Sequence, residues 1–150
     1  MTSLIRVAVL LPVKFESGGE LLADIAALDA AGAYAACVGD VGPDAWVVLG
    51  AVAGVTHQAR IGIVTRDEYP AEAFAALDRI SGGRALAIAP GTAWKQIEMP
   101  ANRAAWRDAL ETHEAAGAEG VVVAWDQRLI DLLRNPDADD DRSDLLMSTG

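Results

Sequence analysis

The side chains of this chain best suited to moving protons are carboxylates, and two of them stand side by side at Asp67 and Glu68. A carboxylate acts as a general acid or base when its surroundings tune its pKa. Arg66 adjoins the pair, however, and its charge compensates theirs, which suits a solvated loop equally well. We favour the solvated loop.

Nucleophilic and metal-ligating side chains are few. The chain has two histidines, His57 and His113, and one cysteine, Cys37. His57 follows a helical segment, where a cationic or hydrogen-bonding group is favoured as a cap, and His113 shares a helical face with Trp106 and Leu110. Cys37 stands among alanine and valine residues, which predicts a buried small hydrophobe. The sequence therefore predicts no paired-histidine metal site and no cysteine–histidine nucleophile.

Glycine-rich and aromatic segments indicate binding rather than acid–base work. Ser17-Gly18-Gly19 precedes a helical segment and is suited to cradling a phosphate, although we favour a plain flexible loop. Trp94 and Trp125 could flank a planar ring, but tryptophan more commonly packs in a core or an interface. Neither a GxGxxG nor a GxxxxGK[ST] motif occurs, which argues against a Rossmann cofactor site and a P-loop.

The elements that must position these residues are short apolar runs separated by segments of helical spacing. Because the runs are apolar nearly throughout instead of alternating, they predict parallel strands covered on both faces. Gly32, Gly82 and Gly117 each fall just past a helical segment, where a left-handed residue ends a helix. We therefore predict an α/β fold of about five parallel βα units, with strands at residues 5–11, 35–38, 60–64, 85–89 and 120–124.

This arrangement sorts the candidate residues, because ligands of parallel α/β folds bind at the carboxyl ends of the strands. Asp40 follows the second predicted strand, Thr65 the third, and Gly91 and Trp94 the fourth. His57 falls at the opposite end. An open sheet has two exposed edges that a soluble protein must cover or pair, which predicts a homodimer through an edge or through an uncovered flank.

Composition limits the classes of function. The chain has 150 residues, of which 52% are apolar and 23% are charged, and its formal net charge is −10. Such an acidic chain is not expected to bind nucleic acid or an anionic membrane, because both are negatively charged. The longest uncharged apolar stretch, 45–55, is too short to span a bilayer, and the N-terminus lacks a small-residue cleavage site, so we expect a cytoplasmic protein. We predict one domain over residues 1–135 and an acidic, disordered tail over residues 136–150.

Several segments resemble the bacterial luciferase-like monooxygenase family. Residues 44–56 and 59–65 are similar to its second helix and third strand, and the run Leu-Asp-Arg-Ile-Ser-Gly-Gly-Arg at 77–84 resembles its helix-to-strand turn. Residues 91–94 are similar to its segment ending in Gly-Trp, and residues 108–123 to its last helix and eighth strand. The resemblance implies a fold derived from a TIM barrel and an oxidoreductase or monooxygenase that uses reduced FMN or F420 on a small organic substrate.

The resemblance also implies roles for single residues: Thr65, Gly91 and Trp94 bind the cofactor, and Asp40 positions substrate or manages a proton. The family's middle βα units are missing here, because only residues 90–119 separate the fourth strand from what looks like the last. The expected fold is thus a truncated TIM barrel. Two functions stay open, a shortened dimeric oxidoreductase and a cofactor-free dimeric scaffold or partner-binding remnant. A flavodoxin-like binding domain, with a different strand order, is a third.

Overall fold

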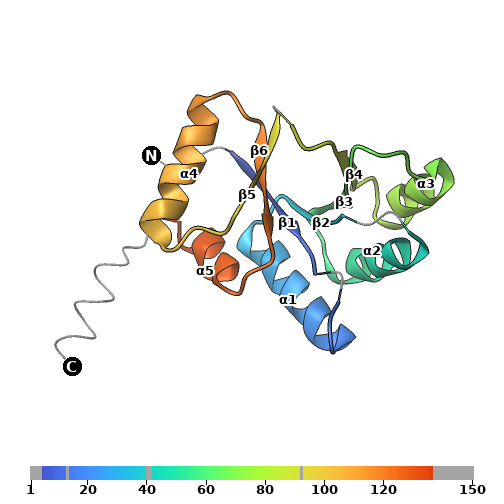
Figure 1. Cartoon of the computed structure of the whole chain (residues 1–150). Coiled ribbons are helices and arrows are strands. Elements are labelled where there is room, and N and C mark those ends of the chain that lie inside the picture. Colours follow the sequence, from blue (N-terminus) through green and yellow to red (C-terminus); the bar gives the residue numbers. More distant parts are fainter. Residues whose placement is uncertain (1–4, 13, 40–41, 92, 137–150) are drawn as a thin grey trace.

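The computed structural model of the chain describes residues 5–12, 14–39, 42–91 and 93–136, and Figure 1 shows their arrangement. Strands and helices alternate along the chain, except that β4 leads directly to β5. The strands are β1 (Arg6–Leu10), β2 (Ala35–Val38), β3 (Arg60–Val64), β4 (Ala85–Ile88), β5 (Trp94–Ile97) and β6 (Gly120–Ala124). The helices are α1 (Gly18–Ala31), α2 (Pro43–Val55), α3 (Ala71–Ile80), α4 (Arg103–Ala115) and α5 (Arg128–Arg134).

The strands pair in parallel in one sheet of order β4-β3-β2-β1-β6-β5. This is the order of a βα barrel from which part of the circumference is left out, so the sheet forms a half-barrel. The predicted α/β class and truncated-barrel architecture are confirmed. Among the described strands β1 pairs with β2 and β6, which is not the flavodoxin-like order, in which β1 would pair with β3.

The predicted number of about five strands is one too low for the part of the chain that the structure describes. The additional strand is β5, which lies at an edge of the sheet and reads Trp-Lys-Gln-Ile. An edge strand is partly solvated, so Lys95 and Gln96 break the continuous apolarity that identifies the central strands. The five predicted strands match β1–β4 and β6 to within one residue at each end.

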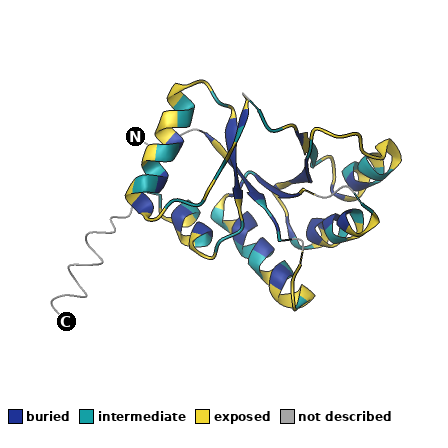
Figure 2. Cartoon of the chain, viewed as in Figure 1, coloured by how far each residue is buried: buried dark blue, intermediate teal, exposed yellow. Residues whose placement is uncertain are grey.

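The helices cover one face of the sheet. The larger apolar cluster joins residues of all five helices, such as Ile25, Leu49 and Trp106, to alternate strand residues such as Val9 and Ile61. Figure 2 shows buried residues along the strands and on the sides of the helices that face them. A second cluster, on the inner face, is built from residues at the strands alone: Ala8, Ala35, Cys37, Val64, Ile88, Trp94 and Val122. The strands are therefore apolar on both faces without a second layer of helices.

Local signals explain where α1 begins and ends. Ser17 caps the helix, its Oγ accepting the Glu20 N–H at 3.2 Å, so the Ser-Gly-Gly segment begins a helix. Gly32 follows the last turn with φ 101°, a left-handed conformation that costs glycine little, as the sequence predicts.

Gly62 has a different role, because it allows two strands to approach. A Cβ built at this position would stand 1.6 Å from the carbonyl oxygen of Leu86. β3 and β4 therefore pair in this register only because residue 62 has no side chain.

Two expectations from the sequence concern the chain as a whole. Within the described ranges, no helix combines the length and the apolar character needed to cross a bilayer. Most of the acidic segment predicted to be a tail, residues 137–150, lies outside the described residues.

Candidate functional site

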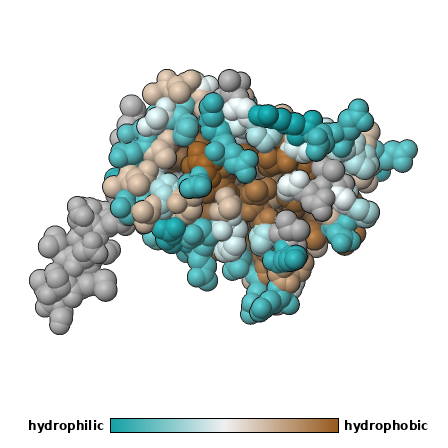
Figure 3. Space-filling view, viewed as in Figure 1, coloured by the Kyte–Doolittle hydropathy of each residue, from teal (hydrophilic) through white to brown (hydrophobic). Residues whose placement is uncertain are grey.

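Three neighbouring strands end in an apolar surface on the inner face of the half-barrel. Leu10 of β1 is partly exposed, and Gly39 after β2 and Ala124 at the end of β6 are exposed. A Cβ at Gly39 would stand 3.7 Å from Leu10 Cδ1, so the residues of β1 and β2 lie in contact. Figure 3 shows apolar residues gathered over the strands on this face, with hydrophilic residues around them. We call Leu10, Gly39 and Ala124 the carboxyl-edge bed.

The loops after β3 and β4 meet beside this edge and bring two predicted site residues together. The Thr65 N–H donates to the Ile88 carbonyl at 2.9 Å, and the Thr65 hydroxyl accepts the Asp67 N–H at 3.0 Å. Arg66 Nε donates to the Pro90 carbonyl at 2.7 Å, and the Arg66 guanidinium lies 3.7 Å from where a Cβ of Gly91 would stand. Thr65 and Gly91 therefore border the same end of the sheet.

Trp94, the third predicted cofactor-binding residue, contacts Gly91, whose N–H donates to the Trp94 carbonyl at 2.9 Å, but it lies at the amino end of its own strand. It is the first residue of β5, pairs with Gly120 and is only 7% exposed. Its ring lies 5.9 Å from that of Tyr34, and the Arg6 guanidinium stands 4.5 Å above Tyr34. A Cβ on Gly120 would meet the indole at 2.4 Å, so the glycine makes room for it. Trp94 thus fills the amino-terminal end of the inner face.

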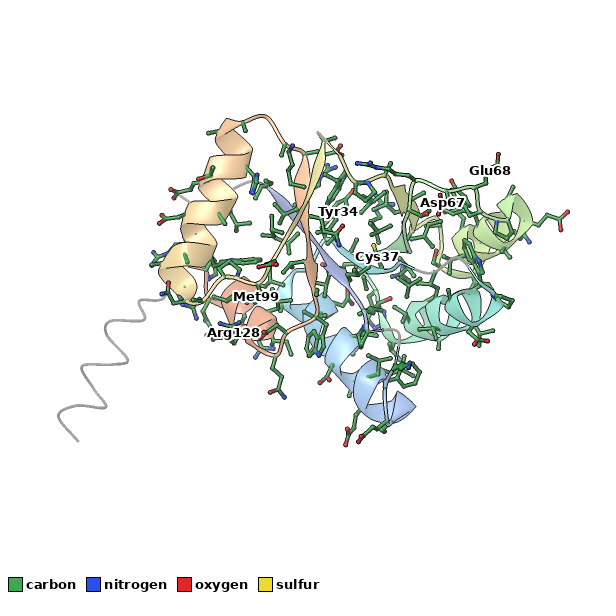
Figure 4. The ribbon with its side chains drawn as sticks, in the orientation of Figure 1. Tyr34, Cys37, Asp67, Glu68, Met99 and Arg128 are labelled. Atoms are coloured by element: carbon green, nitrogen blue, oxygen red, sulfur yellow. The ribbon has the colours of Figure 1, made fainter. Side chains whose placement is uncertain are left out.

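The remaining polar residues considered as site candidates do not come together at one described site. Asp40, the predicted catalytic residue, lies outside the described residues. Asp67 and Glu68 are exposed and lie toward α3, away from Tyr34 and Cys37 over the sheet, as Figure 4 shows. Burial raises the pKa of the Cys37 thiol to about 12, so it stays protonated. Across the described part of the chain, no group of three His, Cys, Asp or Glu side chains is placed to hold a metal ion.

The run at 77–84 that carries most of the family resemblance has a structural role at the amino-terminal end of the sheet. Arg84 donates to the carbonyls of Ala53 and Thr56 at the end of α2, both at 3.2 Å, and to the Thr56 hydroxyl at 2.9 Å. It also donates to the carbonyls of Ser81 at 2.7 Å and Ala59 at 2.9 Å. A single guanidinium therefore ties the end of α2 to the start of β3 and to the turn before β4.

Asp29, which was not predicted from the sequence, also holds separate segments together. This buried carboxylate accepts the backbone N–H groups of His57, Gln58 and Ala59 at 2.7, 3.1 and 2.7 Å. Burial alone would raise the pKa of Asp29, but the three hydrogen bonds together hold it below its ordinary value. His57 lies in this turn and its backbone N–H donates to Asp29, whereas the predicted capping role of its side chain stays a prediction.

Two arginines line a pocket of about 240 Å³ between the start of α4 and α5. Arg103 is buried and forms an ion pair with Asp131, and its Nη1 donates to the Asn135 carbonyl. Arg128 pairs with Asp126 at 3.1 Å, and this hydrogen bond lowers the pKa of the Asp126 carboxyl. Because both guanidinium groups are paired with carboxylates, the pocket is electrostatically compensated.

Comparison with known proteins adds no family assignment. No family model matches the chain, and no curated protein matches it.

The residues at the carboxyl edge match in type what a flavin or F420 requires, namely a surface for a planar ring and positive charge for a phosphate. The carboxyl-edge bed is apolar and carries small side chains. Lys14 and Arg66 follow β1 and β3 at the same end of the sheet, and both are exposed. A cation favours a phosphate, although the exposed Glu16, Asp67 and Glu68 beside these two residues oppose it. Thr65 and Gly91 border this site, whereas the ring of Trp94 is buried beside Tyr34.

Proposed function

We propose that the chain is a luciferase-like oxidoreductase that binds reduced FMN or F420 at the carboxyl ends of its strands and acts on a small organic substrate. The observation that carries the proposal is the carboxyl-edge bed, an apolar surface that none of the described helices covers. Exposed apolar surface beside a few polar groups is typical of a ligand site. The resemblance of residues 77–84 and 91–94 to the luciferase-like family supplies the class of cofactor.

The residues have distinct parts in this proposal. Leu10, Gly39 and Ala124 support the ring of the cofactor and exclude water from one of its sides. Arg66, held by its bond to the Pro90 carbonyl, neutralises the phosphate together with Lys14. The cofactor, when bound, supplies hydride transfer or oxygen activation. Asp40, the residue after Gly39 in the sequence, remains the proposed residue for handling a proton.

The second candidate is a scaffold or partner-binding protein that keeps the barrel core without its chemistry. Two observations favour it. Arg84 of the family-like run at 77–84 ties α2, β3 and the turn before β4 together, and Trp94 is buried on the inner face. A protein under selection for folding alone would keep both features.

Equilibrium dialysis against FMN and F420, in oxidised and reduced forms, separates the two functions. The oxidoreductase proposal predicts saturable binding of at least one cofactor, measured from its absorbance. Ala124→Phe, which fills the carboxyl-edge bed, should abolish binding, whereas Ala104→Phe at an exposed position of α4 should not change it. If neither FMN nor F420 binds in either redox form, the scaffold or partner-binding function is favoured.

A phosphate test examines the role of Arg66 separately. If Arg66 neutralises the phosphate, the wild-type chain should bind FMN more tightly than riboflavin, and Arg66→Ala should remove most of that difference. An equal loss of affinity for both ligands would contradict this role, because it would indicate a general structural effect.

A further inference from the structure

Three aromatic rings meet near the starts of α2 and α3. The centroid of the Tyr69 ring lies 6.5 Å from that of Trp46 in α2 and 5.5 Å from that of Phe74 in α3, and the ring planes are inclined by 42° and 43°. Tyr69 is 37% exposed, whereas Trp46 and Phe74 are half-buried. We call these three residues the aromatic cluster. A ring that is held by its neighbours and partly open to water can offer its electron-rich face to a cation.

Acidic side chains precede each ring of the aromatic cluster. Asp67 and Glu68 come directly before its tyrosine, and both are exposed and lie toward α3 (Figure 4). Asp44 of α2 and Glu72 of α3 each stand two residues before the ring of their own helix, and both are exposed in the first turn. The negative potential of these four carboxylates repels anions and attracts cations.

The two carboxylates between β3 and α3 have no structural role in the described part of the chain. Negative charge in a first turn stabilises a helix, which accounts for the acidic residues of α2 and α3. Asp67 and Glu68 stand outside any helix, and among the described residues neither carboxylate accepts a hydrogen bond or forms an ion pair. Arg66, the neighbouring cation, donates instead to the Pro90 carbonyl at 2.7 Å. Both negative charges are therefore available to a ligand.

We propose that the aromatic cluster and the carboxylates before it bind a small organic cation that carries an alkylated ammonium group. The Tyr69 ring supplies a cation–π contact, and Asp67 and Glu68 supply the opposite charge. A metal ion fits less well, because it needs several converging oxygen ligands and the described residues contain no group of three side chains placed to supply them. None of these residues belongs to the carboxyl-edge bed, so this ligand does not depend on what the bed binds.

Titration calorimetry with choline and with 3,3-dimethyl-1-butanol tests the charge of the ligand. The two probes have nearly the same shape, but only choline is positively charged. The wild-type chain should bind choline at least about tenfold more tightly than the neutral alcohol. High salt should weaken the binding of choline and leave that of the alcohol unchanged. Absence of choline binding, or equal affinity for both probes, would overturn the proposal.

Two substitutions of Tyr69 separate the effect of its ring from that of its bulk. Tyr69→Leu keeps an apolar side chain but removes the ring, and should weaken choline binding at least about fivefold. Tyr69→Phe keeps the ring and should bind choline nearly as the wild type does. Because the ring packs between two helices, circular dichroism should first establish that both variants are folded. Wild-type choline affinity in folded Tyr69→Leu would overturn the proposal.

The carboxylates can be tested without disturbing the rings, because they are exposed. The double variant with Asp67→Asn and Glu68→Gln should bind choline about three- to tenfold more weakly than the wild type, and should bind the neutral alcohol equally well. Glu111→Gln, at an exposed position of α4, is the matched control and should leave choline binding unchanged. Equal choline affinity in the double variant and the control would overturn the proposal.

Discussion

Replacing Arg84 is the sharpest test of whether the family-like run at 77–84 serves folding or chemistry. Its guanidinium donates five hydrogen bonds, with donor–acceptor distances of 2.7 to 3.2 Å, to four residues of three separate segments. Arg84→Ala removes all five and leaves carbonyl groups at the end of α2 without these donors. It also removes a cation from a helix C-terminus, where a positive charge is favourable.

The expected cost follows from these contacts. A hydrogen bond to a charged donor contributes about 1.5–3 kcal/mol, but Arg84 is partly exposed and water replaces part of each bond, so we expect a total loss of about 2–4 kcal/mol. Arg84→Lys keeps the charge but lacks the planar fork of donors, and should lose at least half as much.

Urea unfolding followed by tryptophan fluorescence and circular dichroism measures this loss as a lower midpoint at unchanged slope. Arg107→Ala, which removes a half-exposed arginine from α4, is the control and should stay within about 0.5 kcal/mol of wild type. Equal losses of unfolding free energy for Arg84→Ala and Arg107→Ala would refute the structural role of Arg84. If Arg84 serves folding alone, the folded Arg84→Ala variant should bind FMN or F420 as the wild type does, because the carboxyl edge lies at the other end of the strands.

Three further predictions concern the core and its titratable groups. Gly62→Ala should unfold the chain or displace β4, since the new Cβ would overlap the Leu86 carbonyl; a wild-type urea midpoint would contradict this. Asp29→Asn should destabilise the chain at pH 7, and the difference from wild type should shrink as the pH falls from the ordinary pKa of an aspartate through the lowered pKa of folded Asp29; a pH-independent difference would argue against the charge. Iodoacetamide at pH 8 should modify Cys37 only after unfolding, because its pKa of about 12 and its burial keep the thiol protonated and inaccessible.

The central strands were predictable because each is apolar on both faces, and three helix ends were predictable from glycine. Gly32, Gly82 and Gly117 all have the left-handed φ that their positions after helices indicate. β5 was not predictable in the same way, because its Lys95 and Gln96 have the polarity of an exposed edge.

The candidate site was predictable only in part, because it depends on which end of a strand a loop reaches. Thr65 and Gly91 follow their strands and lie at the carboxyl edge, as expected. Trp94 also follows β4 in sequence, but it begins a new strand and so lies at the amino edge. The role of Asp29 could have been predicted, because an acidic residue in the last turn of a helix is unfavourable unless other groups bind it. Three backbone N–H groups bind Asp29.

The connection between β4 and β5 has a geometric consequence for the whole sheet. These strands form opposite edges, yet Ile88 and Trp94 are only six residues apart and can be separated by at most about 22 Å. In a flat sheet, five gaps between strands would place the two edges about 24 Å apart. The register adds an offset along the strands, because Trp94 is level with Arg6, whereas Ile88 is level with a point two residues beyond Leu10.

That offset is about 20 Å, so the straight-line separation in a flat sheet would be about 31 Å, which six residues cannot bridge. The sheet therefore cannot flatten while the chain is intact. The connection acts as a tether that holds the two edges toward each other and keeps the inner face concave without the strands that would otherwise close a barrel. Lengthening this tether with glycine residues would release the curvature while leaving every paired strand in place.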